Sequence, residues 1–272
     1  FFVAYVKMGV GGVALATVIA QVVSSILCLI KLSKMKENFD FKLKYLKPEA
    51  DYVKKIVRLG LPSGLTQAIF SSAMIVVQSL TNQFGEAFIA ANVIIMRVDG
   101  FAMMPNFSFG TALTTFSGQN VGAGLYDRVT KGAKEGLLLA VGCSAAITGI
   151  ILIFGKQLMG VFTDTKELVD MSYRLMLILA TGYIAMAVTQ SLSGIMRGAG
   201  DTVTPMIISL ITTIAIRIPI AYGISYLTRT PELPVGRCEC IQISLLTTWV
   251  IGAILTVIFY KAGKWKSKSI VK

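Results

Sequence analysis

The sequence predicts an all-α integral membrane protein with about seven transmembrane helices, and three observations lead to this fold class. Of its 272 residues, 54% are hydrophobic and 15% are charged, whereas a soluble domain carries about 25% charged residues. A bilayer core of about 30 Å requires roughly 20 apolar residues for each helical crossing. Runs of this kind occupy residues 10–30, 59–81, 87–117, 136–155, 170–196, 204–228 and 241–261. So many long apolar runs exclude a soluble helical bundle.

The third observation is the placement of the positive charge, which is +12 in total. If the segments alternate across the membrane, most Lys and Arg residues between and after them fall on one side. The opposite loops hold Lys156, Lys166, Arg229 and Arg237. Because cytoplasmic loops carry the excess of Lys and Arg, we expect the C-terminus in the cytoplasm and the protein in the cell membrane. The charge then indicates topology and contact with the lipid bilayer, not binding to nucleic acid.

The polar stretches divide the chain into four parts. Residues 31–58 form a long basic segment interrupted by Pro48, as expected of a cytoplasmic linker between two membrane bundles. Residues 59–261 contain six of the apolar runs, and residues 262–272 form a basic cytoplasmic tail. The chain opens on apolar residues without Met, so we expect residues 1–30 to be a helix whose beginning is missing.

Polar side chains recur at helical spacing within three of the runs. Such residues are costly in lipid and mark either helix contacts or a pathway. At about 100° per residue, each set falls on one face of its helix, with Met residues between. We expect them to line a partly hydrated cavity, although hydrogen bonding between helices is the alternative for any single residue. The candidates are Gln67, Ser71 and Gln78, then Asn92, Asp99 and Asn106, then Tyr183, Met186 and Gln190.

Three ionisable residues lie deep in the predicted helices. Asp99 and Arg217 lie near the middle of their segments, and Arg97 lies on nearly the opposite face from Asp99. A lone charge near the bilayer centre costs at least about 2.5–3.5 kcal/mol, so each needs a partner or water. Asp99 is either paired with Arg217 or is a site for a cation or proton. Asp170 and Arg174, one turn apart, are expected to form a surface pair.

No pattern in the chain favours an enzyme. The sequence contains no His, the commonest general base and metal ligand, and no phosphate-binding loop of Walker spacing. Cys238 and Cys240 flank Glu239, and a lone C-x-C is weak evidence for metal. We expect neither a metal nor a cofactor.

Several motifs resemble, in order, those of the multidrug and toxic compound extrusion (MATE) family. They are MGVGGVALATVIAQ at residues 8–21, RLGLPSG at 58–64, FAMMPNFSFGTALTTFSGQNVGAG at 101–124, MRGAGDTVTPM at 196–206 and RIP at 217–219. The resemblance implies a twelve-helix transporter made of two six-helix lobes. It implies that this chain holds the sixth helix, the linker and the C-terminal lobe, and that the absent N-terminal lobe is a partner.

The resemblance also implies an antiporter that exports organic, often cationic or amphipathic, compounds in exchange for H⁺ or Na⁺. Sodium-coupled members carry a Glu in the seventh helix and an Asp in the tenth. Here Phe70 lies near the expected Glu, and residues 171–200 contain no carboxylate. Asp99 is therefore the local candidate for coupling, and the coupling ion stays open.

The stretch SGIMRGAGDTVTPM, residues 193–206, is expected to be a rigid cytoplasmic turn between two crossings. Gly198 and Gly200 permit a left-handed exit from one helix. Asp201 or Thr202 can cap the next helix, and Pro205 suits its first turn. Arg197 is expected at the cytoplasmic interface.

Two other functions remain open at this point. A lipid-linked precursor flippase of the same superfamily would favour a strongly basic cavity, and only Arg97 and Arg217 are predicted to lie deep enough. A channel or a membrane scaffold is the other alternative, although the sequence shows no repeated filter element.

Overall fold

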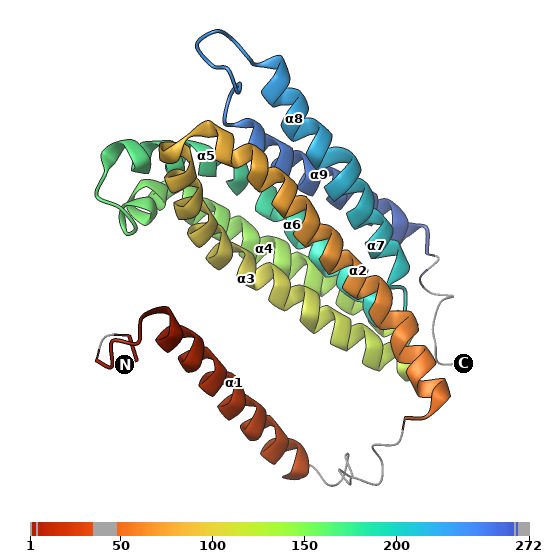
Figure 1. Ribbon diagram of the computed structural model, residues 1–272. Coiled ribbons are helices and arrows are strands. Elements are labelled where there is room, and N and C mark those ends of the chain that lie inside the picture. The colour runs from red at the N-terminus through yellow and green to blue at the C-terminus, as the bar shows by residue number, and fades with distance from the viewer. Residues whose placement is uncertain (1, 4, 35–47, 264, 266–272) are drawn as a thin grey trace. The chain divides into compact units, whose positions relative to one another are not determined.

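The computed structural model describes residues 2–3, 5–34, 48–263 and 265, and these are arranged almost entirely as helices (Figure 1). Six helices are long and apolar enough to cross a membrane, or seven if a bent pair counts as one span. This confirms the predicted fold class. The chain divides into two compact units, Phe1–Lys54 and Lys55–Lys272.

The first unit contains α1 (Gly9–Lys34), an apolar helix whose last turn holds Lys31 and Lys34. The next helix, α2 (Ala50–Thr81), begins within the range expected for the linker. The run expected from residue 59 is therefore the later part of a longer helix. The rest of the predicted linker, residues 35–47, and most of the predicted tail lie outside the described residues.

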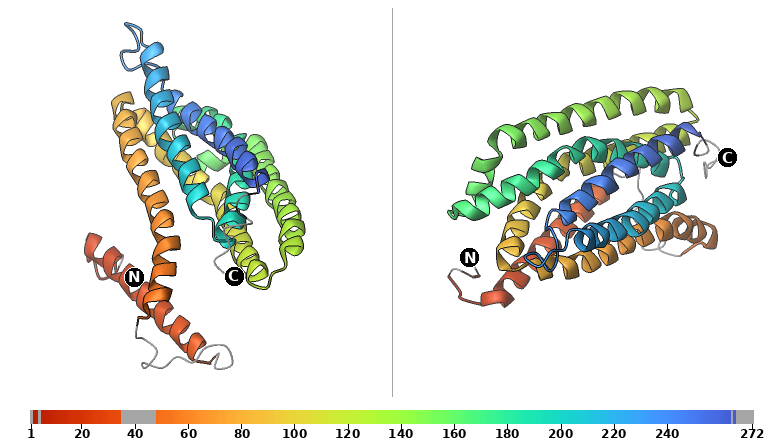
Figure 2. Two further views of the ribbon diagram at one scale, coloured as in Figure 1. Left: turned by 90° about the vertical axis from the view of Figure 1, so that its right-hand side faces the viewer. Right: turned by 90° about the horizontal axis from the view of Figure 1, so that it is seen from above.

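The second unit continues from α2 through a short 3-10 turn, η2 (Asn82–Phe84), into the long helices α3 (Glu86–Gly122) and α4 (Tyr126–Gly160). α5 (Lys166–Ala180), α6 (Gly182–Gly198), α7 (Val203–Leu210), the π-helix η3 (Ile211–Arg217), α8 (Ile218–Leu227) and α9 (Cys240–Lys261) follow. α3 and α6 pack against each other at the centre. Figure 2 shows α4 on one side of them and α2 and α8 on the other.

Glycines bring α3 and α6 into close contact along their length. A Cβ atom on Gly194 would lie 2.3 Å from the carbonyl oxygen of Gly110, and one on Gly198 would lie 2.2 Å from that of Thr114. Small residues allow membrane helices to approach in this way. Ser117 adds a hydrogen bond, donating to the carbonyl oxygen of Ile195 at 2.9 Å. We call this interface the α3–α6 seam.

The run predicted at residues 170–196 is two helices and not one. α5 and α6 meet at an angle of 45°. A Cβ atom on Gly182 would lie 2.5 Å from the indole ring of Trp249 on α9, so the first residue of α6 leaves room for a large ring. The bend lies beside this contact between distant segments, and no proline stands at the break.

The run predicted at residues 204–228 is also divided, with the π-helix η3 between α7 and α8. Pro219 is the second residue of α8, the helix that follows η3, and proline cannot donate to the carbonyl group four residues earlier. A π-helix is rare and often marks a functional position. Arg217 is its last residue.

The turn between α6 and α7 is formed largely as expected. Gly200 adopts a φ of 95°, and the Asp201 carboxylate accepts hydrogen bonds from the backbone N–H of Thr204 at 3.2 Å and from its hydroxyl at 2.7 Å. Pro205 lies buried in the first turn of α7. Gly198 differs from expectation, because it serves the close packing against Thr114 while Gly200 supplies the left-handed turn.

Candidate functional site

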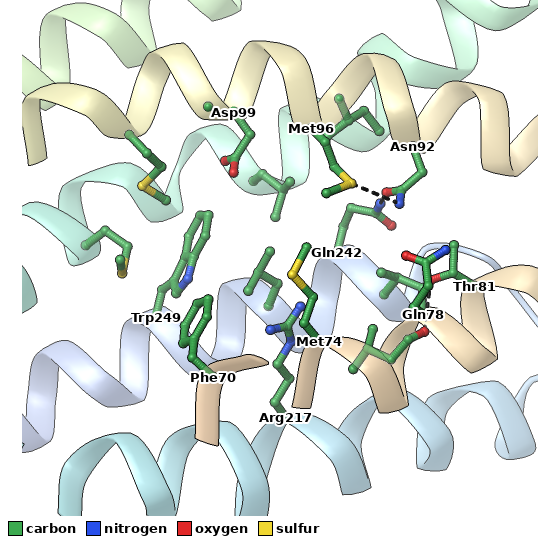
Figure 3. A pocket seen from close by; sticks show the side chains of 18 of the residues that line it. Phe70, Met74, Gln78, Thr81, Asn92, Met96, Asp99, Arg217, Gln242 and Trp249 are labelled. Atoms are coloured by element: carbon green, nitrogen blue, oxygen red, sulfur yellow. Dashed lines mark hydrogen bonds between the residues drawn. The ribbon is translucent and has the colours of Figure 1, made fainter. Parts of the chain in front are cut away.

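A cavity of about 240 Å³ lies between α2, α3, α9 and the end of η3, all in the second unit (Figure 3). We call it the Asp99-side cavity. Its wall combines aromatic rings and Met side chains with a few polar groups, the composition typical of a site for small organic ligands. The labelled lining residues in Figure 3 are Phe70, Met74, Gln78, Thr81, Asn92, Met96, Asp99, Arg217, Gln242 and Trp249.

Asp99 is held from the α6 side by a tyrosine. The hydroxyl of Tyr183 donates to a carboxylate oxygen of Asp99 at 2.9 Å, and the Tyr183 ring is fully buried against Trp249, with ring centroids 5.8 Å apart. Because one carboxylate oxygen accepts this bond, the side chain is fixed in orientation while it still lines the cavity. Tyr183 therefore supports the cavity from behind and does not line it.

The far part of the same cavity carries amide groups from three helices. The side-chain amide of Gln242 on α9 donates to the side-chain oxygen of Asn92 at 3.4 Å, and that of Gln78 on α2 donates to the side-chain oxygen of Asn82 at 2.9 Å. The side-chain oxygen of Gln242 is buried without a hydrogen-bond partner in the structure. Asn92 also approaches the Met96 sulfur at 4.0 Å. These groups leave hydrogen-bonding capacity in this part of the cavity, beside its apolar side chains.

Arg217 points into the cavity from the η3 side, as Figure 3 shows. Its side chain is only 7% exposed, and its Nε atom has no hydrogen-bond partner. Among the described residues, no ion pair within 4.0 Å joins it to Asp99, so the predicted pairing is wrong as a direct contact. Asp99 bonds to Tyr183 in its place.

A second cavity of about 360 Å³ lies on the other side of Arg217, and we call it the Arg197-side cavity. The two cavities share a wall of apolar side chains and one guanidinium group. Those shared residues are Phe70, Phe107, Met186, Arg217, Leu245 and Trp249. Gln67, Gln190 and Arg197 line the second cavity, so the expected cavity residues are divided between two chambers.

Besides Tyr183, three predicted residues line neither cavity. Asn106 is 1% exposed and joins helices: it donates to the Tyr183 backbone oxygen at 3.4 Å and accepts from Ser144 at 2.6 Å. Ser71 and Arg97 are exposed and line neither cavity. For Asn106 the alternative of hydrogen bonding between helices was the correct one.

Several lining residues were not selected from the sequence. Phe70 was noted only as standing in place of a carboxylate, and Trp249, Met74 and Gln242 were not singled out. Arg197, expected at the interface, is partly buried against the second cavity. Gln242 could have been selected from the sequence, because it is a polar residue near the start of the apolar run 241–261.

The ion pairs near the ends of α4, α5 and α9 also differ from expectation. Asp170 pairs with Lys156 at 2.6 Å, and Arg174 pairs with Glu239 at 3.2 Å, so Asp170 and Arg174 do not pair with each other. Burial raises the pKa of the neighbouring Cys238 thiol above its ordinary value, and the Glu239 carboxylate raises it further. Within the described ranges, no group of three or more Cys, Asp or Glu could hold a metal ion.

Comparison with known families gives a match along the second unit. The family model described as MatE matches residues 62–223, a range that includes both cavities except for the part contributed by α9.

Curated relatives match over nearly the whole chain. The probable multidrug resistance protein YoeA of Bacillus subtilis (strain 168) is 27% identical over 98% of this chain and 57% of its own length. The probable multidrug resistance protein NorM of Thermotoga maritima is 24% identical over 97% of this chain and 56% of its own length. The chain thus spans less than two thirds of the length of these relatives.

Solved structures share the fold. The outward-facing conformation of a multidrug resistance MATE family transporter of the MOP superfamily superposes with a TM-score of 0.86, at 21% identity, over 98% of this chain and 59% of its own. A MOP superfamily transporter from Pyrococcus furiosus Vc1 gives a TM-score of 0.84, at 21% identity, over 96% of this chain and 58% of its own.

Proposed function

Since the chain belongs to the MatE family, we propose that it is the C-terminal part of a secondary active antiporter that exports organic compounds across the cell membrane. Organic cations and amphipathic molecules are its substrates, and H⁺ or Na⁺ entry drives their export. The names of curated relatives as multidrug resistance proteins support export of organic compounds. The positive charge of the loops supports a cytoplasmic C-terminus.

The observation that carries this proposal is a carboxylate beside aromatic and Met side chains in a membrane-embedded cavity. Aromatic rings and Met accept apolar bodies of varied shape, and the Asp99 carboxylate attracts a cationic group or binds a proton. Transport then requires the cavity to open alternately to the two sides, which in such transporters occurs by rocking of one bundle against another. We propose that an N-terminal lobe supplies the second bundle and that the surrounding bilayer is the remaining partner.

Coupling follows from competition for Asp99 in this proposal. A carboxylate that carries a proton or a sodium ion no longer attracts a cationic substrate, so ion entry on one side releases the substrate there. The Tyr183 hydroxyl donates to Asp99 and leaves the second carboxylate oxygen toward the cavity. The proposed exchange therefore needs one carboxylate and no cofactor.

Asp99→Asn tests this directly. In everted membrane vesicles that contain the full-length transporter, the substitution should reduce ion-driven transport of the cationic dye rhodamine 123 by about tenfold or more, because about 1.4 kcal/mol of lost interaction corresponds to that factor. Arg97→Gln is the matched control, since Arg97 lies on the same helix, is exposed and lines neither cavity.

Unchanged transport by Asp99→Asn at equal protein levels would remove Asp99 from the mechanism. Transport that rises linearly with dye concentration, without saturation, would indicate a channel and contradict the antiporter.

A further inference from the structure

The Arg197-side cavity has a charge character opposite to that of the Asp99-side cavity. The residues that line it include Arg197 and Arg217 and, within this described set, neither Asp nor Glu. Arg197 forms no ion pair with any described residue. The lining of this cavity therefore holds two guanidinium groups and no carboxylate, while Asp99, which attracts Arg217 electrostatically, lines the other cavity.

The buried Arg217 makes this imbalance costly. A charge taken out of water needs a partner or hydrogen bonds to offset its lost hydration. Arg217 is 7% exposed, its Nε atom has no partner, and Asp99 is not within ion-pair distance. A guanidinium group offers several N–H donors in a planar fork that matches a carboxylate. An anionic group in this cavity would satisfy it.

The other polar side chains of the cavity fall into two groups, those that already form a hydrogen bond and those that form none. The hydroxyls of Thr66, Thr189, Thr212 and Thr248 donate to carbonyl groups of their own helices. Ser193, Thr213 and Gln190 line the cavity and form no side-chain hydrogen bond with another described residue. Gln67 and Ser209 also line the cavity and likewise form no such bond, so these five side chains and the two guanidinium groups offer donors to a ligand.

The wall between the cavities is apolar apart from Arg217. Phe70, Phe107 and Trp249 belong to both linings, so aromatic rings form much of the wall that the two chambers share. A molecule that reached both chambers would meet a carboxylate in one and guanidinium groups in the other. The Arg197-side cavity, at about 360 Å³, has the size of a small-molecule site.

We propose that the Arg197-side cavity is an anion subsite, in which Arg197 and Arg217 bind the carboxylate of an amphipathic aromatic solute. In a solute that also carries a positive charge, the cationic end would lie toward Asp99. The subsite proposal rests on the proposed function only because it takes the ligand to be an exported solute. Binding to the subsite can be measured without transport.

Two dyes that differ at one group test this subsite. Rhodamine 110 carries a free carboxylate, and rhodamine 123 is its methyl ester. Fluorescence polarisation would measure the Kd of each dye with purified full-length protein in nanodiscs of zwitterionic lipid. Arg197→Gln should raise the Kd of rhodamine 110 about tenfold, the factor expected when a hydrogen bond to a charged group is lost.

The methyl ester is the internal control for folding. Its Kd should change by about twofold or less, since a charge at a distance acts weakly through screening. Arg197→Lys keeps the positive charge but not the planar fork, so its Kd for rhodamine 110 should lie between those of the wild type and Arg197→Gln. Arg97→Gln, which removes an equal charge from an exposed position, should leave the Kd of both dyes unchanged.

Three results would overturn the subsite. They are an unchanged Kd of rhodamine 110 in Arg197→Gln, an equal loss for both dyes, and displacement of rhodamine 110 when phosphatidylglycerol replaces the zwitterionic lipid. The last result would assign the cavity to a lipid headgroup. If Arg197→Gln weakens binding of rhodamine 110 alone while Asp99→Asn leaves transport unchanged, the subsite is retained and the proposed coupling is rejected. If Asp99→Asn reduces transport while Arg197→Gln affects neither dye, the coupling is retained and the subsite is rejected.

Discussion

The α3–α6 seam and the cavity side of the same unit show two ways of packing membrane helices. In the seam, Gly110, Gly194 and Gly198 let backbones touch, and almost no side-chain volume separates the helices. On the cavity side, Phe70, Met74 and other large side chains of α2, η3 and α9 surround open space. The contrast indicates that the seam is the rigid support, while the opposite helices can adapt to a ligand.

The largest effect is expected from a side chain placed in the seam. Gly194→Leu must displace the Gly110 carbonyl group, which lies 2.3 Å from the position of the new Cβ atom. Overpacking of this kind should cost about 3 kcal/mol or more. Thermal unfolding of the purified protein in detergent, together with its yield, would measure the loss.

Gly142→Leu is the matched control, because a Cβ atom on Gly142 of α4 meets nothing within 4 Å. It should change stability by about 0.5 kcal/mol or less. If Gly194→Leu unfolds at the same temperature as this control, the seam is not rigid and does not differ in this respect from the cavity side.

An intermediate effect is expected where α3 meets α4. Ser144→Ala removes the donor to Asn106, a bond of 2.6 Å between side chains that are both buried. The unsatisfied amide oxygen should cost about 1–3 kcal/mol. Chemical unfolding of Ser144→Ala beside Ser108→Ala would show it, because the Ser108 hydroxyl is exposed and bonds only within its own helix. Equal stability of the two variants would speak against a buried network at Asn106.

The smallest effect is expected on the cavity side. Met74→Ala truncates a side chain that is 43% exposed, so it should change the free energy of unfolding by about 0.5 kcal/mol or less. Leu80→Ala, on the same helix but at a position only 1% exposed, should cost about 2–5 kcal/mol. Similar losses for both variants would show that the cavity wall is packed as tightly as the core.

The sequence predicted the helical membrane fold because hydropathy depends on local composition alone. It also predicted Asp99, Asn92 and Gln78 as cavity residues, since a face of one helix can be read from residue spacing. What it could not predict was which neighbour each face meets. Asn106 repeats the spacing of Asp99, yet it meets Ser144 and the Tyr183 backbone in place of open space.

Arg197 shows a different limit. Its position beside glycines in a polar turn indicated an interface residue, whereas in the structure it lines a cavity. That cavity is formed by residues of α2, α3, α6, α7, η3 and α9, which lie far apart in the chain. Residue spacing within one segment carries no information on such an arrangement.

The π-helix η3 has a consequence for how this protein tolerates insertions and deletions. The number of residues in η3 determines which way the side chains of α7 and α8 face relative to each other. Loss of one residue ahead of Arg217 would turn that residue by about 100° around the helix axis, out of the wall that it shares between two cavities. The deletion would replace no side chain of the cavity wall, yet the Arg217 guanidinium group would face another helix or the lipid.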